Sequence, residues 1–104
     1  MDSSLFNEFL ESGDTLRVYK DDQLLFSSDK DRMFPLLEYI DKFANSHQHV
    51  TIIDKIMGNA AALLSVKANC DEVYSPLGSQ LAIETLDKYG IKHHIAEIVP
   101  YIQK

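Results

Sequence analysis

Residues 50–64, VTIIDKIMGNAAALL, decide the fold of this chain. Residues 50–53 are all β-branched, which predicts a buried strand, and the small residues that follow Gly58 predict a helix packed closely on a sheet. A strand followed directly by a helix is the repeating unit of α/β proteins. Because the strand ends in the charges of Asp54 and Lys55 rather than in a neutral turn, we expect a ligand site at this end.

Strands and helices alternate on both sides of this stretch. A helix is expected within residues 1–13, followed by a hairpin over 15–28 that turns at Asp21 and Asp22. Three further helices are expected, from Pro35 to Asn45 or Ser46, over 58–68 and over 79–90. The remaining strands are expected over 49–54, 71–75 and 91–99. Such an order predicts parallel strands joined by right-handed crossovers, with the antiparallel hairpin at one side. The fold class is therefore α/β, a three-layer α-β-α arrangement around a mixed sheet.

Length and composition indicate one folded domain. The chain has 104 residues, of which 45% are hydrophobic and 25% charged, an ordinary globular composition. No linker, repeat or low-complexity tract interrupts it. We expect residues 1–104 to form a single domain whose short N-terminal helix, within residues 1–13, is capped by Ser3 or Ser4 and stopped by Gly13.

The charge balance bears on the class of partner. Sixteen acidic against ten basic side chains give a formal charge of −6, and such a surface repels the nucleic-acid backbone. The basic residues are scattered, unlike those of a helix that lies on a membrane. We expect neither nucleic acid nor a membrane as partner. The apolar end around Tyr101 and Ile102 favours a homodimer, which no spacing in the sequence establishes.

Cysteine usage and the N-terminus indicate the compartment. Cys70 is the only cysteine, so neither an intramolecular disulfide nor a cysteine-based zinc cluster is expected. Residues 1–14 have no basic leader and no continuous apolar stretch, and no apolar run is long enough to span a bilayer. A cytoplasmic location is expected.

Four segments in a fixed order resemble a known family. They are DRMFPLLEYI (31–40), IIDKIMGNAAALL (52–64), EVYSPLGSQLAIETLDKYGI (72–91) and EIVPYIQ (97–103). The chain resembles domain-of-unknown-function family 1893, a group of uncharacterised bacterial and archaeal proteins, from about Leu16 to Gln103. It departs from the family pattern at Met33 and Phe34, and has Asn59 where lysine is common. The resemblance implies a cytidine-deaminase-like fold.

The resemblance to deaminases concerns the fold and not the metal site. Zinc deaminases place a His or Cys with a Glu at one helix start and a Pro-Cys motif at the next. The corresponding stretches here are Asn-Ala-Ala at 59–61 and Pro-Leu-Gly-Ser at 76–79. Because neither supplies the ligands, we expect no zinc deaminase activity, no metal and no cofactor.

The strongest candidate binding site is DKIMGN, residues 54–59. Backbone N–H groups at a helix start attract anions, and Gly58 permits close approach. Lys55 adds positive charge, and Asp54 and Asn59 add hydrogen bonds, which suits a small anionic or nucleotide-like ligand. A true phosphate loop carries more glycine. The alternative is that Asp54 and Lys55 only cap the following helix or pair with Arg32 and a neighbour.

Two residues outside this loop are candidates for the same ligand. Arg32 precedes a helix start, and its guanidinium suits a carboxylate or phosphate, although a solvated surface arginine explains it as well. Ser75 lies near the first loop if both connections open at the same sheet edge. Ser79 is explained by capping the next helix.

The histidines and the cysteine do not form a recognisable site. The adjacent pair His93 and His94 points to opposite faces of a strand, and His47 and His49 lie at a loop-to-strand junction, so solvated or core-edge histidines are the default. Cys70 lacks a nearby histidine, which favours a buried small residue over a nucleophile.

Three hypotheses for function follow from these patterns. The first is a domain that binds a small anionic or nucleotide-like ligand through Asp54, Lys55, Gly58, Asn59, Arg32 and Ser75. The second is a protein-interaction or oligomeric module without catalysis, for which the acidic surface suffices. The third is a metal-free enzyme in which a buried Lys55 next to Asp54 acts as base or nucleophile.

Overall fold

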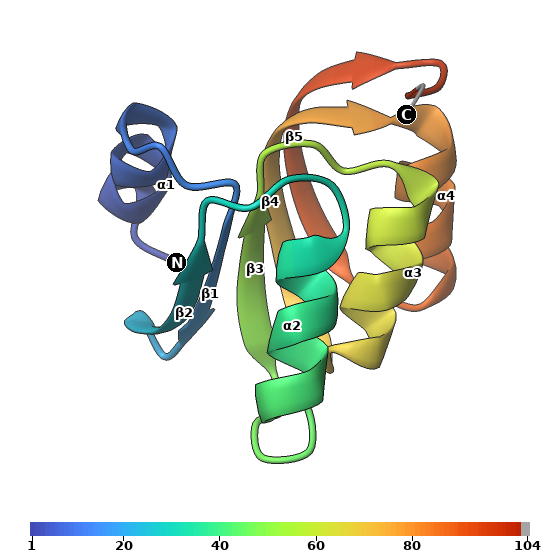
Figure 1. Ribbon diagram of the computed structural model, residues 1–104. Helices are drawn as coiled ribbons and strands as arrows, with labels where there is room; N and C mark the ends of the chain where they lie inside the picture. The colour runs from blue at the N-terminus through green and yellow to red at the C-terminus, as the bar shows by residue number, and fades with distance from the viewer. Residues whose placement is uncertain (103–104) are drawn as a thin grey trace.

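The computed structural model describes residues 1–102 and has a mixed α/β architecture. In that range the chain forms α1 (Ser3–Glu11), β1 (Leu16–Lys20), β2 (Gln23–Ser28), α2 (Phe34–Phe43), β3 (Val50–Asp54), α3 (Asn59–Lys67), β4 (Cys70–Ser79), α4 (Gln80–Lys88) and β5 (Lys92–Val99). The order of helices and strands predicted from the sequence is confirmed (Figure 1). No helix within residues 1–102 is long and apolar enough to cross a membrane.

The strands form one mixed sheet in the order β2-β1-β3-β4-β5. Strand β1 is antiparallel to both β2 and β3, whereas β3, β4 and β5 run parallel. The β1–β2 hairpin turns at Asp21 and Asp22, whose φ angles of 51° and 64° suit the tight turn that matches the strand twist. The predicted parallel strands with an antiparallel hairpin at one side are confirmed.

The direction of the crossovers decides which face of the sheet the helices cover. The connections through α2, α3 and α4 all step the same way across the sheet, from β2 to β3, β4 and β5. Because such crossovers share one hand, their helices must lie on one face. Figure 1 shows α2, α3 and α4 together on that face and α1 on the other. The face bearing α1 is therefore less covered.

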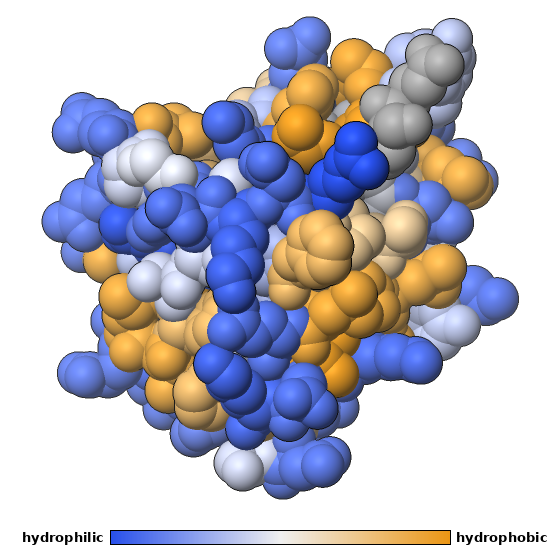
Figure 2. Space-filling view, viewed as in Figure 1, coloured by the Kyte–Doolittle hydropathy of each residue, from blue (hydrophilic) through white to orange (hydrophobic). Residues whose placement is uncertain are grey.

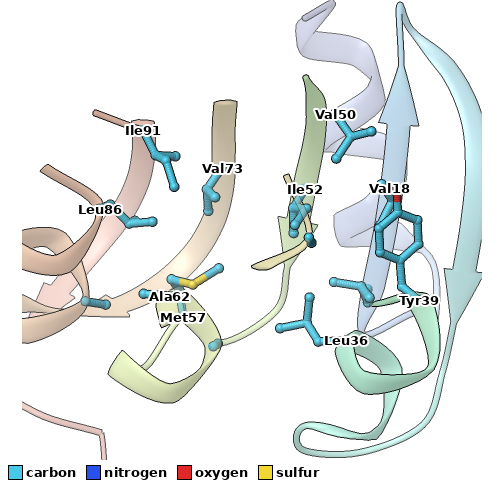
Figure 3. Packing of buried hydrophobic residues seen from close by; sticks show 14 residues of the cluster. Val18, Leu36, Tyr39, Val50, Ile52, Met57, Ala62, Val73, Leu86 and Ile91 are labelled. Atoms are coloured by element: carbon cyan, nitrogen blue, oxygen red, sulfur yellow. The ribbon is translucent and has the colours of Figure 1, made fainter. Parts of the chain in front are cut away.

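Strand β3 is buried on both faces. Ile52 belongs to the larger core, where Leu36 and Tyr39 of α2 point toward the sheet (Figure 3). Ile53 belongs to a smaller cluster under α1, with Phe9 and Tyr19. A strand covered on both sides needs apolar residues at successive positions, which explains the β-branched run. Helix α3 packs closely because its buried residues include alanine and serine.

Some element boundaries differ from the prediction. Strand β4 extends through Pro76 and Gly78 to Ser79, where the sequence suggested a loop after residue 75. Its ladder with β5 continues to Ser79↔Val99, while its ladder with β3 ends at Tyr74. The register with β5 skips Pro76, which has no N–H to donate, and on the opposite side Met57 takes over from β3 by pairing with Gly78.

Two helix ends also differ. Asp2, and not Ser3 or Ser4, caps α1, because its carboxylate accepts a hydrogen bond of 3.0 Å from the Ser4 N–H. Helix α2 ends at Phe43, slightly before the predicted Asn45 or Ser46. These prediction errors are a matter of one turn or less and leave the packing unchanged.

Candidate functional site

A small hollow of about 140 Å³ lies at the carboxyl end of β3. It is lined by Thr15, Asp31, Arg32, Asp54, Lys55 and Ile56. Three separate segments form it: the residue before β1, the loop from β2 to α2, and the loop from β3 to α3. Antiparallel pairing of Leu16 with Asp54 brings the first and third segments together. The Lys55 N–H then donates to the Thr15 carbonyl over 3.0 Å.

Three of the predicted site residues meet in this hollow. Arg32 and Lys55 are exposed, while Asp54 is 8% exposed. The Ile56 N–H donates a hydrogen bond of 3.2 Å to Asp54 Oδ1, which holds the start of the loop as an Asx-type turn. The structure thus brings together the charged strand end and the arginine that the sequence singled out.

Arg32 has a left-handed backbone, with φ of 60°. The Phe34 N–H donates to the Asp31 carbonyl over 3.3 Å, so the chain turns sharply here between β2 and α2. A side chain other than glycine pays about 1 kcal/mol or more for this conformation. The conformation places Arg32 in the wall of the hollow rather than in the helix that follows.

The two cations have no partner of opposite charge within the described residues. Among the ion pairs in residues 1–102, none involves Arg32 or Lys55. Helix α3 is capped at Gly58 without a side-chain hydrogen bond, so neither Asp54 nor Lys55 caps it. The alternative was that these charges only cap the helix or form ion pairs. For Arg32 and Lys55, the described residues show neither a capping contact nor an ion pair.

The other predicted residues lie outside the hollow. Gly58 is the buried N-cap position of α3. Asn59 Oδ1 accepts a hydrogen bond from Thr85 Oγ1, which ties α3 to α4. Ser75 is fully buried; its Oγ donates to the Leu77 carbonyl over 2.8 Å and accepts from the Leu77 N–H over 3.2 Å. These contacts give the three residues roles in the fold.

The sequence did not indicate Thr15 or Asp31 of the hollow, and it indicated Ile56 only as a member of the stretch 54–59. Thr15, Asp31 and Ile56 join it through the turn geometry and through the pairing of β1 with β3. The Thr15 hydroxyl donates to the Ser28 carbonyl over 3.2 Å and to the Lys30 carbonyl. The alternation of residues 15–28 predicts a hairpin, but it does not show which strand lies on the other side of β1.

The comparisons with known proteins place the chain in a family. A family model described as "Domain of unknown function (DUF1893)" and named TM1506 matches residues 5–104. The chain belongs to the DUF1893 family. It is also similar to the crystal structure of a DUF1893 family protein (TM1506) from Thermotoga maritima. The TM-score is 0.87 at 24% identity, over 98% of this chain and 68% of that one.

The likeness to the Thermotoga maritima structure shows a shared fold alone, because the identity is below 25%. No curated protein matches the chain. The comparisons therefore assign this DUF1893 protein to a family of unknown function and name neither a substrate nor a reaction.

His93 and His94 of the DUF1893 chain are each paired with a carboxylate. His93 Nε2 lies 2.8 Å from Asp87 Oδ1 of α4, and His94 Nε2 lies 2.8 Å from Glu72 Oε2 of β4. The two rings therefore point to opposite faces of β5, as predicted. Over residues 1–102, no three His, Cys, Asp or Glu side chains come together in a group that suits a metal ion.

The two stretches that the resemblance to deaminases singled out, 59–61 and 76–79, contain no histidine, cysteine or carboxylate. Asn59, Ala60 and Ala61 begin α3, and residues 76–79 finish β4 rather than starting a helix. Ser79 caps α4 by accepting a hydrogen bond of 3.0 Å from the Ala82 N–H, which confirms the capping role predicted for it. The residues present do not fit a deaminase zinc ion.

Cys70 lies at the start of β4, away from the hollow. Burial raises the pKa of its thiol to about 12, with a further contribution from the neighbouring Asp71. A thiol with such a pKa is almost wholly protonated near neutral pH and is a poor nucleophile. Cys70 is partly buried and packs against the larger core, which agrees with a small packing residue rather than a nucleophile.

Proposed function

We propose that this DUF1893 protein binds a small molecule through an anionic group held between Arg32 and Lys55. The observation that supports the proposal is the meeting of two exposed cations from separate loops in one hollow, with no ion pair to either within residues 1–102. A guanidinium fork and an ammonium group both bind phosphate and carboxylate oxygens. The left-handed backbone of Arg32 costs conformational free energy, and a role in ligand binding explains why this cost is retained.

The size of the hollow limits what enters it. Pockets that enclose a whole organic ligand measure roughly 300–1,000 Å³, and this one measures about 140 Å³. It accommodates a phosphate or carboxylate group, so the sugar and base of a nucleotide would lie outside. Asp31 and Asp54 also line the hollow, and their charges disfavour a polyphosphate.

The wider setting of the proposal is a cytidine-deaminase-like scaffold with three layers, in a cytoplasmic protein. The mixed sheet with a hairpin at one side, and the core clusters on both of its faces, support that scaffold. A single cysteine suits a reducing compartment. The proposed site lies beyond the carboxyl end of a strand, where α/β sheets commonly bind their ligands.

A second candidate function is that of an interaction module. Phe34 of α2 is 65% exposed, and Leu37 and Leu63 are about half exposed. Figure 2 shows apolar side chains gathered over the face formed by α2 and α3. By contrast, the enzyme hypothesis assumed that Lys55 is buried, and this assumption is wrong because Lys55 is exposed. The desolvation that would activate it is missing.

The test is ligand binding by the full chain and three variants. Native mass spectrometry of protein purified from its host reveals any retained small molecule, and calorimetric titration uses inorganic phosphate, acetate and 5′-nucleoside monophosphates. We expect Arg32→Ala and Lys55→Ala each to weaken binding of a phosphate probe about tenfold or more. The control Lys67→Ala removes an exposed lysine from α3 and should bind as wild type does. Equal binding by all four proteins, or binding by none, contradicts the proposal.

A further inference from the structure

Strand β5 forms an open edge of the sheet. It pairs with β4 from Lys92 to Val99, and it is the last strand of the sheet that residues 1–102 form. None of its eight residues is buried, and Ile98 is 53% exposed. Its outer row of N–H and C=O groups is therefore available to another strand.

This edge is neither short nor bulged, although it carries the charged side chains of Lys92 and Glu97. Edge strands are usually protected by being short, by bulges or by inward-pointing charges. At the opposite edge, β2 has six residues and a register irregularity in its ladder with β1, between Val18 and Tyr19. Strand β5 has eight residues and a continuous register with β4, from Glu72↔Lys92 to Ser79↔Val99. Long regular edges of this kind add a further strand readily.

We infer that β5 pairs antiparallel with β5 of a second copy of this chain, about a two-fold axis at Ile95. In such an isologous pair one residue lies opposite itself, and residues equally distant from it face each other on the same side of the sheet. Centring the axis on Ile95 places His93 opposite Glu97 of the partner subunit, twice by symmetry. It also places His94 opposite the partner's Ala96 and Lys92 opposite the partner's Ile98.

The charges of β5 select this register over its neighbours. An axis at Ala96 places Ile95 opposite the partner's Glu97, and an axis at Glu97 or at His94 places each of these side chains opposite itself. Only the axis at Ile95 joins a histidine to a carboxylate and leaves no like charges opposed. His93 already lies 2.8 Å from Asp87, so a second carboxylate adds to an existing pairing.

The test changes Ile98 and Lys92, which this register places opposite each other near both ends of the paired strands. The full chain is studied by sedimentation equilibrium at micromolar concentration. Ile98→Lys places a lysine opposite Lys92 of the partner subunit at two positions, and we expect the dimer dissociation constant to rise about tenfold or more. Adding Lys92→Glu converts both pairs to opposite charges and should restore most of the affinity. The matched control is Leu24→Lys, because Leu24 is 51% exposed on the other edge strand.

Each outcome decides the inference. A wild-type dimer that is weakened by Ile98→Lys, restored by Lys92→Glu and unaffected by Leu24→Lys supports it. A wild-type monomer, or a dimer that Ile98→Lys and Leu24→Lys affect equally, overturns it, and a failure of Lys92→Glu to restore the dimer overturns the register. Circular dichroism of each variant separates loss of pairing from loss of folding. The site at Arg32 and Lys55 is independent of this edge, so either proposal can fail alone.

Discussion

The imidazole ring of His94 stacks on the phenol ring of Tyr74, with centroids 4.3 Å apart and planes 17° from parallel. Parallel pairing of β4 and β5 sets these residues side by side. Both rings contact Glu72 Oε2, His94 through Nε2 at 2.8 Å and Tyr74 by donating its hydroxyl proton over 3.2 Å. One carboxylate thus fixes two rings on the less covered face of the sheet.

We expect His94→Ala to lower the free energy of unfolding by about 1 kcal/mol, because both the stacking and the contact with Glu72 are lost. His94→Phe keeps a ring over Tyr74 and should cost about half as much. Urea unfolding of the two variants, of Glu72→Gln and of the double variant Glu72→Gln/His94→Phe gives the coupling energy. Equal losses for His94→Ala and His94→Phe would show that stacking contributes nothing.

The sequence predicts β3 well because both of its faces are buried. A β-branched run that packs against Leu36 and Tyr39 on one side and against α1 on the other has only the half-buried Thr51 as a polar position before the strand end. The end of β4 is predicted poorly. Pro76 and Gly78 are turn signals, and the long-range ladder with β5 overrides them.

The same division holds for the candidate site. Asp54 and Lys55 follow a recognisable strand, so local pattern places them at the sheet edge. Thr15 joins them only through the antiparallel pairing of β1 with β3, which joins residues distant in sequence. Ser75 is predicted to end its strand next to the site, but β4 continues past it and its side chain is buried. Local signals locate the loops, and non-local pairing decides which of them meet.

Tyr39 offers a test of a buried hydroxyl. Its side chain is fully buried, and among the described residues its hydroxyl has no hydrogen-bond partner. Its ring packs against Phe26 and Phe43 at centroid distances of 5.7 and 5.6 Å. Tyr39→Phe keeps these ring contacts and removes the cost of the unpaired hydroxyl. We expect the free energy of unfolding to rise by about 1 kcal/mol.

The control for this prediction is Tyr74→Phe, which removes a hydroxyl that does donate a hydrogen bond, to Glu72. That variant should lose about 1 kcal/mol. Thermal and urea unfolding of both proteins give the two values. A loss of stability in Tyr39→Phe as large as that in Tyr74→Phe would indicate that the Tyr39 hydroxyl is satisfied in solution.

Alkaline pH should destabilise the protein through Cys70. Burial raises the pKa of its thiol from 9.0 to about 12, so the native state keeps a proton that the unfolded chain releases above pH 9. Because the native state binds more protons there, its stability is fully present below pH 9 and falls as the pH rises toward 12. Urea unfolding between pH 8 and pH 11 measures the slope, which should be smaller in Cys70→Ala. An unchanged slope contradicts the prediction.

The same thiol should resist alkylation. At pH 8 we expect iodoacetamide to modify Cys70 in the native protein about a thousandfold more slowly than in the urea-unfolded chain, because so little thiolate is present. Mass spectrometry of the intact protein follows the reaction. Rapid labelling of the native protein would show that Cys70 is reactive and would favour a nucleophilic role for its thiol.

Gly78 provides a test of the close contact between β4 and β5. A Cβ atom added at Gly78 would lie 2.9 Å from Ile95 Cγ2 and 3.4 Å from the Met57 carbonyl oxygen. The β-branched Ile95 has little χ1 freedom, so it cannot move away cheaply. We expect Gly78→Ala to lower the free energy of unfolding by about 1–3 kcal/mol, measured by urea unfolding. Gly13→Ala is the matched control, because nothing lies within 4 Å of a Cβ there; similar losses in both variants would mean that the contact with Ile95 is not what excludes a side chain at Gly78.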